Sequence, residues 1–448
     1  MAAVRCVGQD TGWSSPDHRP GILRRVANPF ALHAESIAPA RLGRSFRWLL
    51  ATALVNNVGD GLALAAGPLL VASQTRDPLL VSMAVLAQTL PVLLFGFAAG
   101  VVADRVDRIR LMAAVNLVRA AVLALLASTI VTGQVSIVAV LVTLFVLGTA
   151  ETFADIGGQS ILPRIVRRED LGIANARITG GMLLTNQLIA PPIGAFLFVV
   201  GMALPFATDA ACFALGAVMI LRVRLSPAPT PTADQAAGRR SWRGDMAEGI
   251  RWLAAHPPMR TLFITIVAFN VTFGAAWSVL VLYAQERLGM SDVGFGLLTT
   301  AMAVGGLLGT ASYGRLERRF ALADIMRVGL VIETLTHLVL AITTNASVAL
   351  VTFMVFGAHA FVWGTTATAV RQRAVPDELL GRVTGVYHVG VMAGMVVGTP
   401  IGGWLAREFG ITAPFWFGFA GSAILVTVMW RQFDNIVHAG DVAPGDTR

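Results

Sequence analysis

Runs of about 20 apolar residues recur along nearly the whole chain, and they constrain its fold more than any other feature. About 20 helical residues, each adding about 1.5 Å, cross a hydrocarbon core about 30 Å thick. Inside lipid a backbone must satisfy its own polar groups, so an open-ended span has to be a helix. Twelve such runs occur, at residues 47–73, 80–103, 111–132, 136–160, 174–200, 203–222, 260–285, 293–314, 323–343, 347–370, 383–405 and 411–431. We therefore predict an all-α integral membrane protein with twelve transmembrane helices.

Composition argues against a soluble fold and against a metal or disulfide scaffold. Only 13% of the 448 residues are charged, whereas a soluble domain carries about 25%. Cys6 and Cys212 are too few and too far apart in sequence to suggest a disulfide framework or a metal site. We find no signal peptide before the first span, which is expected to serve as the insertion signal. No cofactor and no bound metal are predicted.

The basic residues, all of them arginine, predict the orientation in the membrane. If the N-terminus is cytoplasmic, 30 of the 34 arginines lie on the inner side. The outer loops hold only Arg76, Arg287 and Arg407, and Arg119 lies inside the third span. This asymmetry follows the positive-inside rule, so both termini are expected in the cytoplasm, with the chain in a bacterial inner (plasma) membrane. The net charge of +8 then indicates contact with anionic lipid rather than with nucleic acid.

One long internal connection divides the chain. It begins with prolines among Ala, Thr and Ser, a composition typical of a flexible linker, and it ends in a stretch that can form a short amphipathic helix near 248–253. The predicted parts are an N-terminal tail (1–46), a six-helix bundle (47–222), the linker (223–258), a second six-helix bundle (259–431) and a C-terminal tail (432–448).

The two bundles repeat each other in sequence. The segment RWLLATALVNNVGDG at 47–61 aligns with RTLFITIVAFNVTFG at 260–274, which pairs Asn57 with Asn270 and Gly61 with Gly274. A parallel repeat of six spans is an architecture in which two halves rock about a central site. We expect two six-helix pseudo-repeats around a central cavity.

A charged motif, GVVADRVDRIR, lies between the second and third spans. Gly100 permits close helix approach, and Asp104 stands beside Arg105 and Arg108. A carboxylate among guanidiniums can cap the next helix and hold neighbouring helices by charge-assisted bonds. These residues are therefore candidates for an inner gate. The alternative is an ordinary charged loop between two helices.

This motif resembles the signature of the major facilitator superfamily, which reads Gly, three residues, Asp-Arg, one residue, then Gly-Arg-Arg or Gly-Arg-Lys. Here Asp107 replaces the second Gly and Ile109 the last basic residue. Asp at that position resembles the branch of drug, macrolide and siderophore exporters, enterobactin exporters among them. Further similar segments are FADIGGQSILPRIV, EGIRWL and VPDELLGRV, and the resemblance covers residues 41–431.

The resemblance implies a monomeric secondary active transporter that exports a small amphipathic or hydrophobic compound by alternating access, driven by protons. An importer of the same fold and a non-transporting receptor or scaffold are the alternatives. There is no phosphate-binding Gly-Lys-Ser/Thr loop and no catalytic constellation, so we do not expect an enzyme. Prolines 191 and 192 are expected to kink the fifth span. The fourth span lacks the arginine that proton antiporters of the superfamily often carry, which leaves the coupling ion open.

Charged residues inside the spans are the candidate proton carriers, because each costs about 2.5 to 3.5 kcal/mol at mid-bilayer and so needs a partner, a cavity or a function. Asp60 in the first span is the main candidate, and a fixed bond to a neighbouring helix is its alternative. Glu151 and Asp155 share one face of the fourth span. Arg119 can pair with either of them, as an ion pair or as part of the gate.

Polar and aromatic residues on the cavity-lining spans are the candidates for contact with substrate, and ordinary packing is the alternative for each. They are Asn56, Asn57, Asn270, Trp277, His359 and Trp363. Glu333 and His337, four residues apart, resemble a metal pair, but a bond within or between helices is the favoured interpretation.

Overall fold

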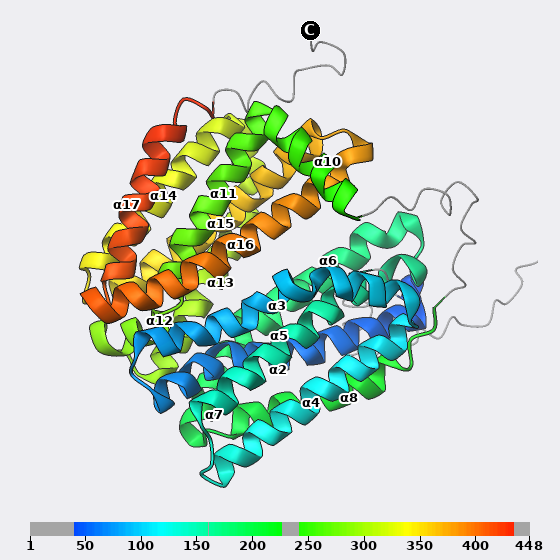
Figure 1. Ribbon diagram of the computed structural model, residues 1–448. Coiled ribbons are helices and arrows are strands. Elements are labelled where there is room, and N and C mark those ends of the chain that lie inside the picture. The colour runs from blue at the N-terminus through cyan, green and yellow to red at the C-terminus, as the bar shows by residue number, and fades with distance from the viewer. Residues whose placement is uncertain (1–39, 160, 226–241, 434–448) are drawn as a thin grey trace, which may run out of the picture.

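The computed structural model describes residues 40–159, 161–225 and 242–433, and in these ranges the chain is helical throughout, with no strand (Figure 1). Ten helical segments are long and apolar enough to cross a membrane. Two shorter apolar helices, Leu204–Ile220 and Ala413–Met429, occupy the places of the sixth and twelfth predicted spans. The prediction of an all-α membrane fold with twelve crossings is confirmed. The predicted N-terminal tail up to residue 39 lies outside the described residues.

The first six crossings form one bundle and the last six form another. The first bundle consists of α2 (Gly43–Gln74), α3 (Pro78–Arg105), α4 (Arg108–Val131), α5 (Ile137–Gln159), a fifth crossing made of α6 (Leu171–Met182), η4 (Leu183–Ile189) and α7 (Ala190–Val200), and α8 (Leu204–Ile220). The second consists of α11 (Pro257–Trp277) with α12 (Leu280–Leu282) and η5 (Tyr283–Arg287), then α13 (Asp292–Arg319), α14 (Leu322–Ile342), α15 (Ala346–Ala374), α16 (Asp377–Phe409) and α17 (Ala413–Met429).

Local chemistry explains where several helices begin and where one is irregular. Asp77 caps α3 by accepting from the backbone N–H of Leu79, and Asp107 caps α4 in the same way. The fifth crossing contains a π-helical segment, η4, directly before Pro191 and Pro192. A proline offers no N–H to the preceding turn, so the helix loosens there, at the place where the sequence predicts a kink.

The two bundles meet at one end of the molecule and diverge toward the other (Figure 1). We call the first the closed end and the second the open end. At the closed end α3 lies along α16 and α7 along α13. Glycines make this approach possible, since a Cβ on Gly403 would collide with Ser82 and one on Gly296 would lie 3.1 Å from the Cβ of Ala195.

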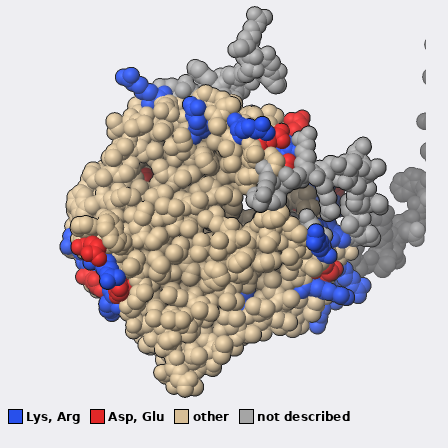
Figure 2. Space-filling view, viewed as in Figure 1, with Lys and Arg blue, Asp and Glu red and all other residues tan. Residues whose placement is uncertain are grey.

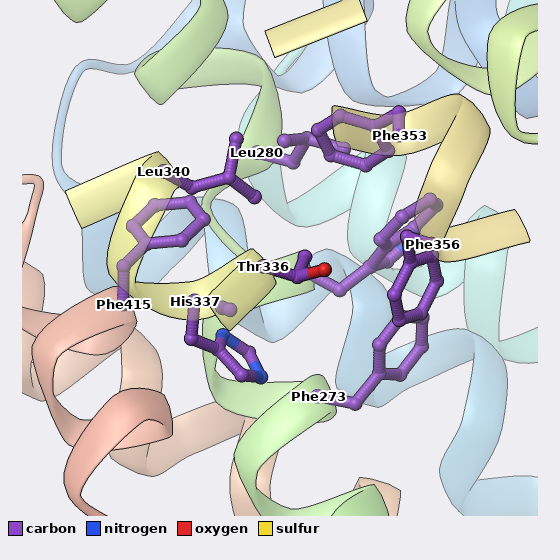
Figure 3. Close-up of a pocket in the computed structure, with 10 residues that line it drawn as sticks. Phe273, Leu280, Thr336, His337, Leu340, Phe353, Phe356 and Phe415 are labelled. Atoms are coloured by element: carbon purple, nitrogen blue, oxygen red, sulfur yellow. The ribbon is translucent and has the colours of Figure 1, made fainter. Parts of the chain in front are cut away.

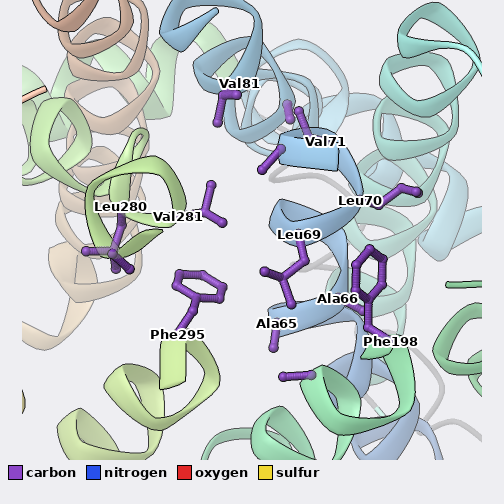
Figure 4. Close-up of a cluster of buried hydrophobic side chains, with 14 of the residues drawn as sticks. Ala65, Ala66, Leu69, Leu70, Val71, Val81, Phe198, Leu280, Val281 and Phe295 are labelled. Carbon is purple, nitrogen blue, oxygen red and sulfur yellow. The ribbon is translucent and has the colours of Figure 1, made fainter. Parts of the chain in front are cut away.

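A buried apolar core seals the closed end across both bundles. Figure 4 shows Leu69 and Val81 of the first bundle facing Leu280, Val281 and Phe295 of the second. These side chains exclude water where the bundles touch. Apolar packing at this end therefore holds the two bundles together.

Charged contacts surround this core at the closed end. The Nη1 atom of Arg407 lies 3.5 Å from Asp77, and Arg76 donates to Gln285 at 2.6 Å. Each contact joins one bundle to the other, so two of the three arginines that the sequence assigns to this side tie the halves together. Figure 2 shows charge gathered at the two ends, a largely uncharged band between them and a hollow between the bundles.

One further helix, α10 (Trp242–Ala255), lies at the open end against α16 (Figure 1). Arg382 on α16 contacts Asp245 and Glu248 of α10, each at 2.9 Å. Gly249 faces the backbone of Arg382, because a Cβ there would lie 3.1 Å from that carbonyl oxygen. This part of the linker is thus attached to the second bundle.

Candidate transport site between the two bundles

A buried guanidinium joins three helices of the first bundle. The Nη2 atom of Arg119 on α4 lies 3.3 Å from Oδ1 of Asp60 on α2 and 3.8 Å from Oε2 of Glu151 on α5. Only 6% of the Arg119 side chain is exposed, against 57% for Glu151. The arginine is therefore held inside the bundle, while the glutamate faces the open space. The sequence offers Glu151 or Asp155 as its partner, and the structure places Asp60 nearer than either.

A fourth helix, α8, completes this polar cluster. Its Phe213 ring lies 4.2 Å beneath the Arg119 guanidinium, and its Asp209 is 1% exposed and faces Gly59 on α2. Sequence reasoning missed Asp209, although a carboxylate inside an apolar run is the same signal that singles out Asp60. In all, four carboxylates act electrostatically on one guanidinium; they are Asp60, Glu151, Asp209 and Asp155.

The three asparagines expected to touch substrate use their amide groups in local bonds. Asn56 donates to the side-chain oxygen of buried Asn116 on α4 at 3.2 Å. Asn57 and Asn270 each donate to the carbonyl four residues earlier in their own helix, at 2.8 Å. These bonds satisfy one amide proton of each residue. Their role in substrate contact stays a prediction.

The second bundle presents an aromatic column on α11 and α15. Its members are Phe269, Phe273 and Trp277 on α11 and Phe353, Phe356 and Trp363 on α15. The rings of Phe269 and Trp363 are 6.4 Å apart and nearly parallel, and those of Phe273 and Phe356 are 5.7 Å apart. Residues four apart share a helix face, so the spacing of the α11 aromatics could have revealed this column. Only Trp277 and Trp363 were selected from the sequence.

Two of the cavities that adjoin this column have room for part of a substrate. One, of about 310 Å³, is lined by His359, Trp363, Arg371 and Tyr387 on the open-end side of the second bundle. The other, of about 180 Å³, lies between the bundles and includes Gln88 of α3 beside residues of α2, α11, α13 and α16. Ligand sites are typically concave and apolar with a few polar groups, and both cavities have that character.

The charged motif lies at the open end, where the bundles are apart. A Cβ at Gly100 would meet nothing within 4 Å, so the close helix approach expected there is absent in this conformation. Arg105 ends α3 and Arg108 begins α4, while Asp107 forms the helix cap. The side chain of Asp104 lies outside the described residues. The gating role of the motif stays a prediction.

The two six-helix bundles, joined at one end around a central cavity, define the chain as a major facilitator transporter. It belongs to the family described as transmembrane secretion effector, which it matches over residues 34–442. The resemblance to the exporter branch of the superfamily is thereby confirmed, and the chain is a multi-pass membrane protein related to bacterial efflux pumps.

Two curated relatives support this placement. The multidrug efflux pump Tap of Mycolicibacterium fortuitum is 27% identical over 385 residues, covering 82% of this chain and 90% of the relative. Macrolide efflux protein A of Streptococcus pyogenes is 22% identical over 371 residues, covering 79% of this chain and 86% of the relative.

Solved structures show the same fold. A bacterial homologue of the iron transporter ferroportin in an inward-facing state matches with a TM-score of 0.70 at 16% identity, covering 87% of this chain and 98% of that one. The nucleoside transporter NupG matches with a TM-score of 0.65 at 12% identity, covering 87% and 99%. A ferroportin homologue in an outward-facing state gives only 0.55 at 17% identity, covering 88% and 100%.

Proposed function

We propose that this protein exports a small amphipathic or hydrophobic compound from a bacterial cytoplasm by alternating access, in exchange for protons. The observation that carries the proposal is the sharing of buried Arg119 between Asp60 and Glu151, beside the space between the bundles. The relation to drug and macrolide efflux pumps supports export as the direction. The aromatic column and the adjoining cavities suit an apolar or amphipathic ligand.

The arginine-rich open end faces the cytoplasm in this proposal. Substrate then enters from the cytoplasmic side, while the apolar core and the contacts of Arg76 and Arg407 close the outer side. A cysteine placed at Thr132 is expected to react with an impermeant reagent from outside, and one placed at Arg319 is not. The reverse pattern would refute the orientation.

Charge balance supports proton coupling in the first bundle. If Asp60, Glu151, Asp155 and Asp209 were all ionised, the single Arg119 would leave three uncompensated negative charges. Uncompensated charge in a low-dielectric interior costs several kcal/mol per ion, so the cluster favours taking up protons when it is sealed from water. Opening to the cytoplasm hydrates the cluster and allows a proton to leave.

The driving force suffices for useful efflux. Moving one elementary charge through 100 mV supplies about 2.3 kcal/mol, which corresponds to a concentration ratio of about fifty for a neutral compound. One exchanged proton per cycle is therefore enough.

Asp60→Asn tests this function. In everted membrane vesicles with an acidified lumen, the unchanged protein is expected to accumulate ethidium and, in a parallel assay, a radiolabelled macrolide. Asp60→Asn should reduce accumulation to the level of vesicles lacking the protein, while ethidium binding to the purified variant is retained. Asp324→Asn, which removes an exposed carboxylate on α14, is the matched control. Normal pumping by Asp60→Asn would make Asp60 structural and Glu151→Gln the next variant, and accumulation only in right-side-out vesicles would indicate an importer.

A further inference from the structure

A second polar cluster lies inside the second bundle, away from the four carboxylates. Glu333 on α14 is wholly buried, and each of its carboxylate oxygens meets an imidazole. The Nε2 atom of His337 lies 3.0 Å from Oε1, and the Nε2 atom of His359 on α15 lies 3.3 Å from Oε2. Both histidines are buried as well. The bond of Glu333 to His337 is the interpretation favoured from the sequence, whereas the participation of His359 comes only from the fold.

The three side chains are arranged in order between the two ends of the molecule. His337 lies one turn of α14, about 6 Å, nearer the closed end than Glu333. It borders a chamber of about 20 Å³ below the closed end, with room for about one water molecule (Figure 3). His359 instead borders the cavity of about 310 Å³ on the open-end side. The cluster therefore touches a separate space on each side of Glu333.

The charge of the cluster depends on a single proton. With both imidazoles neutral and donating Nε2–H to Glu333, the cluster carries one negative charge, and one added proton makes it neutral. Helix α17 carries no charged side chain. The charged side chains of α11 and α13 lie at the ends of those helices. On α14 and α15 the other charges, such as Arg327 and Arg371, lie toward the open end. Within the described residues, no other charge neutralises Glu333, so its burial favours uptake of that proton.

The geometry also provides the atom that would accept the proton. The Nδ1 atoms of His337 and His359 are buried and have no hydrogen-bond partner among the described residues. Nδ1 of His337 faces Gly418 on α17, where a Cβ would lie 2.5 Å away, and Nδ1 of His359 faces Gly329. A neutral imidazole that donates through Nε2 carries a lone pair on Nδ1.

We propose that Glu333, His337 and His359 form a second proton-binding site, located in the second bundle and independent of Asp60. A hydronium ion in an adjoining space transfers a proton to Nδ1 of one imidazole and becomes a water molecule. The resulting imidazolium keeps its Nε2–H bond to Glu333, and the proton later leaves from the same Nδ1. Its use as a coupling proton rests on the proposed export, while the binding itself does not.

Nitrogen NMR of the full-length protein in lipid nanodiscs tests this site directly, because the chain has only seven histidines. His337→Gln and His359→Gln identify the two ring signals. Between about pH 8 and about pH 5, the working range of histidine, one of these rings is expected to become an imidazolium with its Nε2–H still hydrogen-bonded. Glu333→Gln should abolish that conversion, and Glu333→Asp should restore it in part.

Two further variants serve as a positive and a negative control for this test. Gly418→Ala, which retains every titratable group but presses on the His337 ring, should shift the His337 signal, and Asp324→Asn should leave both signals unchanged. If Glu333→Gln fails to fold, the loss of conversion in a single histidine variant tests the site instead. The proposal is overturned if neither ring converts, or if conversion persists unchanged in a folded Glu333→Gln protein. The conversion is expected to survive in Asp60→Asn, so a failure of proton-driven export and a failure of this site give different results.

Discussion

The most informative comparison in this transporter is between the first helix of one bundle, α2, and the first helix of the other, α11. In the repeat alignment, Asn57 pairs with Asn270 and Gly61 with Gly274, so Asp60 falls opposite Phe273. The glycines serve the same purpose in both bundles. A Cβ on Gly61 would lie 2.6 Å from a backbone oxygen of η4, and one on Gly274 would lie 2.9 Å from a backbone oxygen of α16. The packing of the first helix against the fifth of its own bundle is thus preserved.

The polar chemistry, in contrast, has diverged between the two halves. Asn56 and Asp60 in the first bundle stand where the second bundle has Phe269 and Phe273. One helix therefore contributes to an ion cluster around Arg119, and its counterpart contributes half of the aromatic column. In the proposed mechanism, the first bundle carries the main proton site and the second bundle binds the apolar part of the substrate.

Among the variants that test this comparison, the removal of Arg119 should have the largest effect on stability and on efflux. Arg119→Gln leaves Asp60, Glu151 and Asp209 without their shared cation, and breaking one side of a buried ion pair costs about 3 to 5 kcal/mol. We expect a marked loss of thermal stability in detergent and no measurable efflux. The double variant Asp60→Asn with Arg119→Gln should recover part of the stability without activity. Equal stability of the single and double variants would argue against the ion cluster.

The glycine packing that the two bundles share predicts the next largest effect, a loss of stability. Gly61→Val and Gly274→Val should each destabilise the protein by about 1 to 3 kcal/mol, since added carbon atoms would collide with backbone of the neighbouring helix. Thermal unfolding monitored by tryptophan fluorescence measures the change. Gly96→Val on α3, where a Cβ meets nothing within 4 Å, serves as the control. Different costs at Gly61 and Gly274 would weaken the view that the repeat preserves packing.

The aromatic column predicts a smaller and more selective effect. Phe273→Ala removes contacts to Phe269, Phe356 and Trp277, and aromatic pairs are worth about 0.5 to 1.5 kcal/mol each. Affinity for ethidium should fall about tenfold, while proton uptake at the first bundle is unchanged. Phe409→Ala, at an exposed position near the closed end, is the control. An equal loss in both variants would place the binding site elsewhere.

Loss of a charged contact around the closed end should have the smallest effect, a modest shift in the population of the outward-open form. The ion pair of Arg407 with Asp77 is half exposed on the arginine side, and exposed pairs contribute about 0.2 to 1 kcal/mol. Arg407→Gln should therefore shift the population toward the outward-open form by no more than about fivefold. Reaction of a cysteine placed at Thr299, in the cavity between the bundles, with an impermeant reagent added from outside reports the shift. A much larger change would mean that this pair, rather than the apolar core, closes the outer side.

The sequence by itself determined the membrane class, the twelve crossings, the internal repeat and the family. Each of these depends on features that are local along the chain or repeated in it, such as the length of an apolar run or the pairing of Gly61 with Gly274. The cost of placing charge in lipid also made Asp60, Arg119 and Glu151 visible as candidates.

Only the tertiary structure decided which of these residues meet. Arg119 bonds to Asp60, 59 positions away, and His359 joins Glu333 from 26 positions away. Sequence spacing reveals neighbours along one helix, as for Glu333 and His337, but the partner on another helix depends on how two helices are rotated and shifted against each other. That register is set by close packing at many contacts, including the glycines of both bundles. For this reason the contact of Asp209 with Gly59, the role of His359 in the buried cluster and the pairing of the α11 aromatics with those of α15 emerged only from the fold.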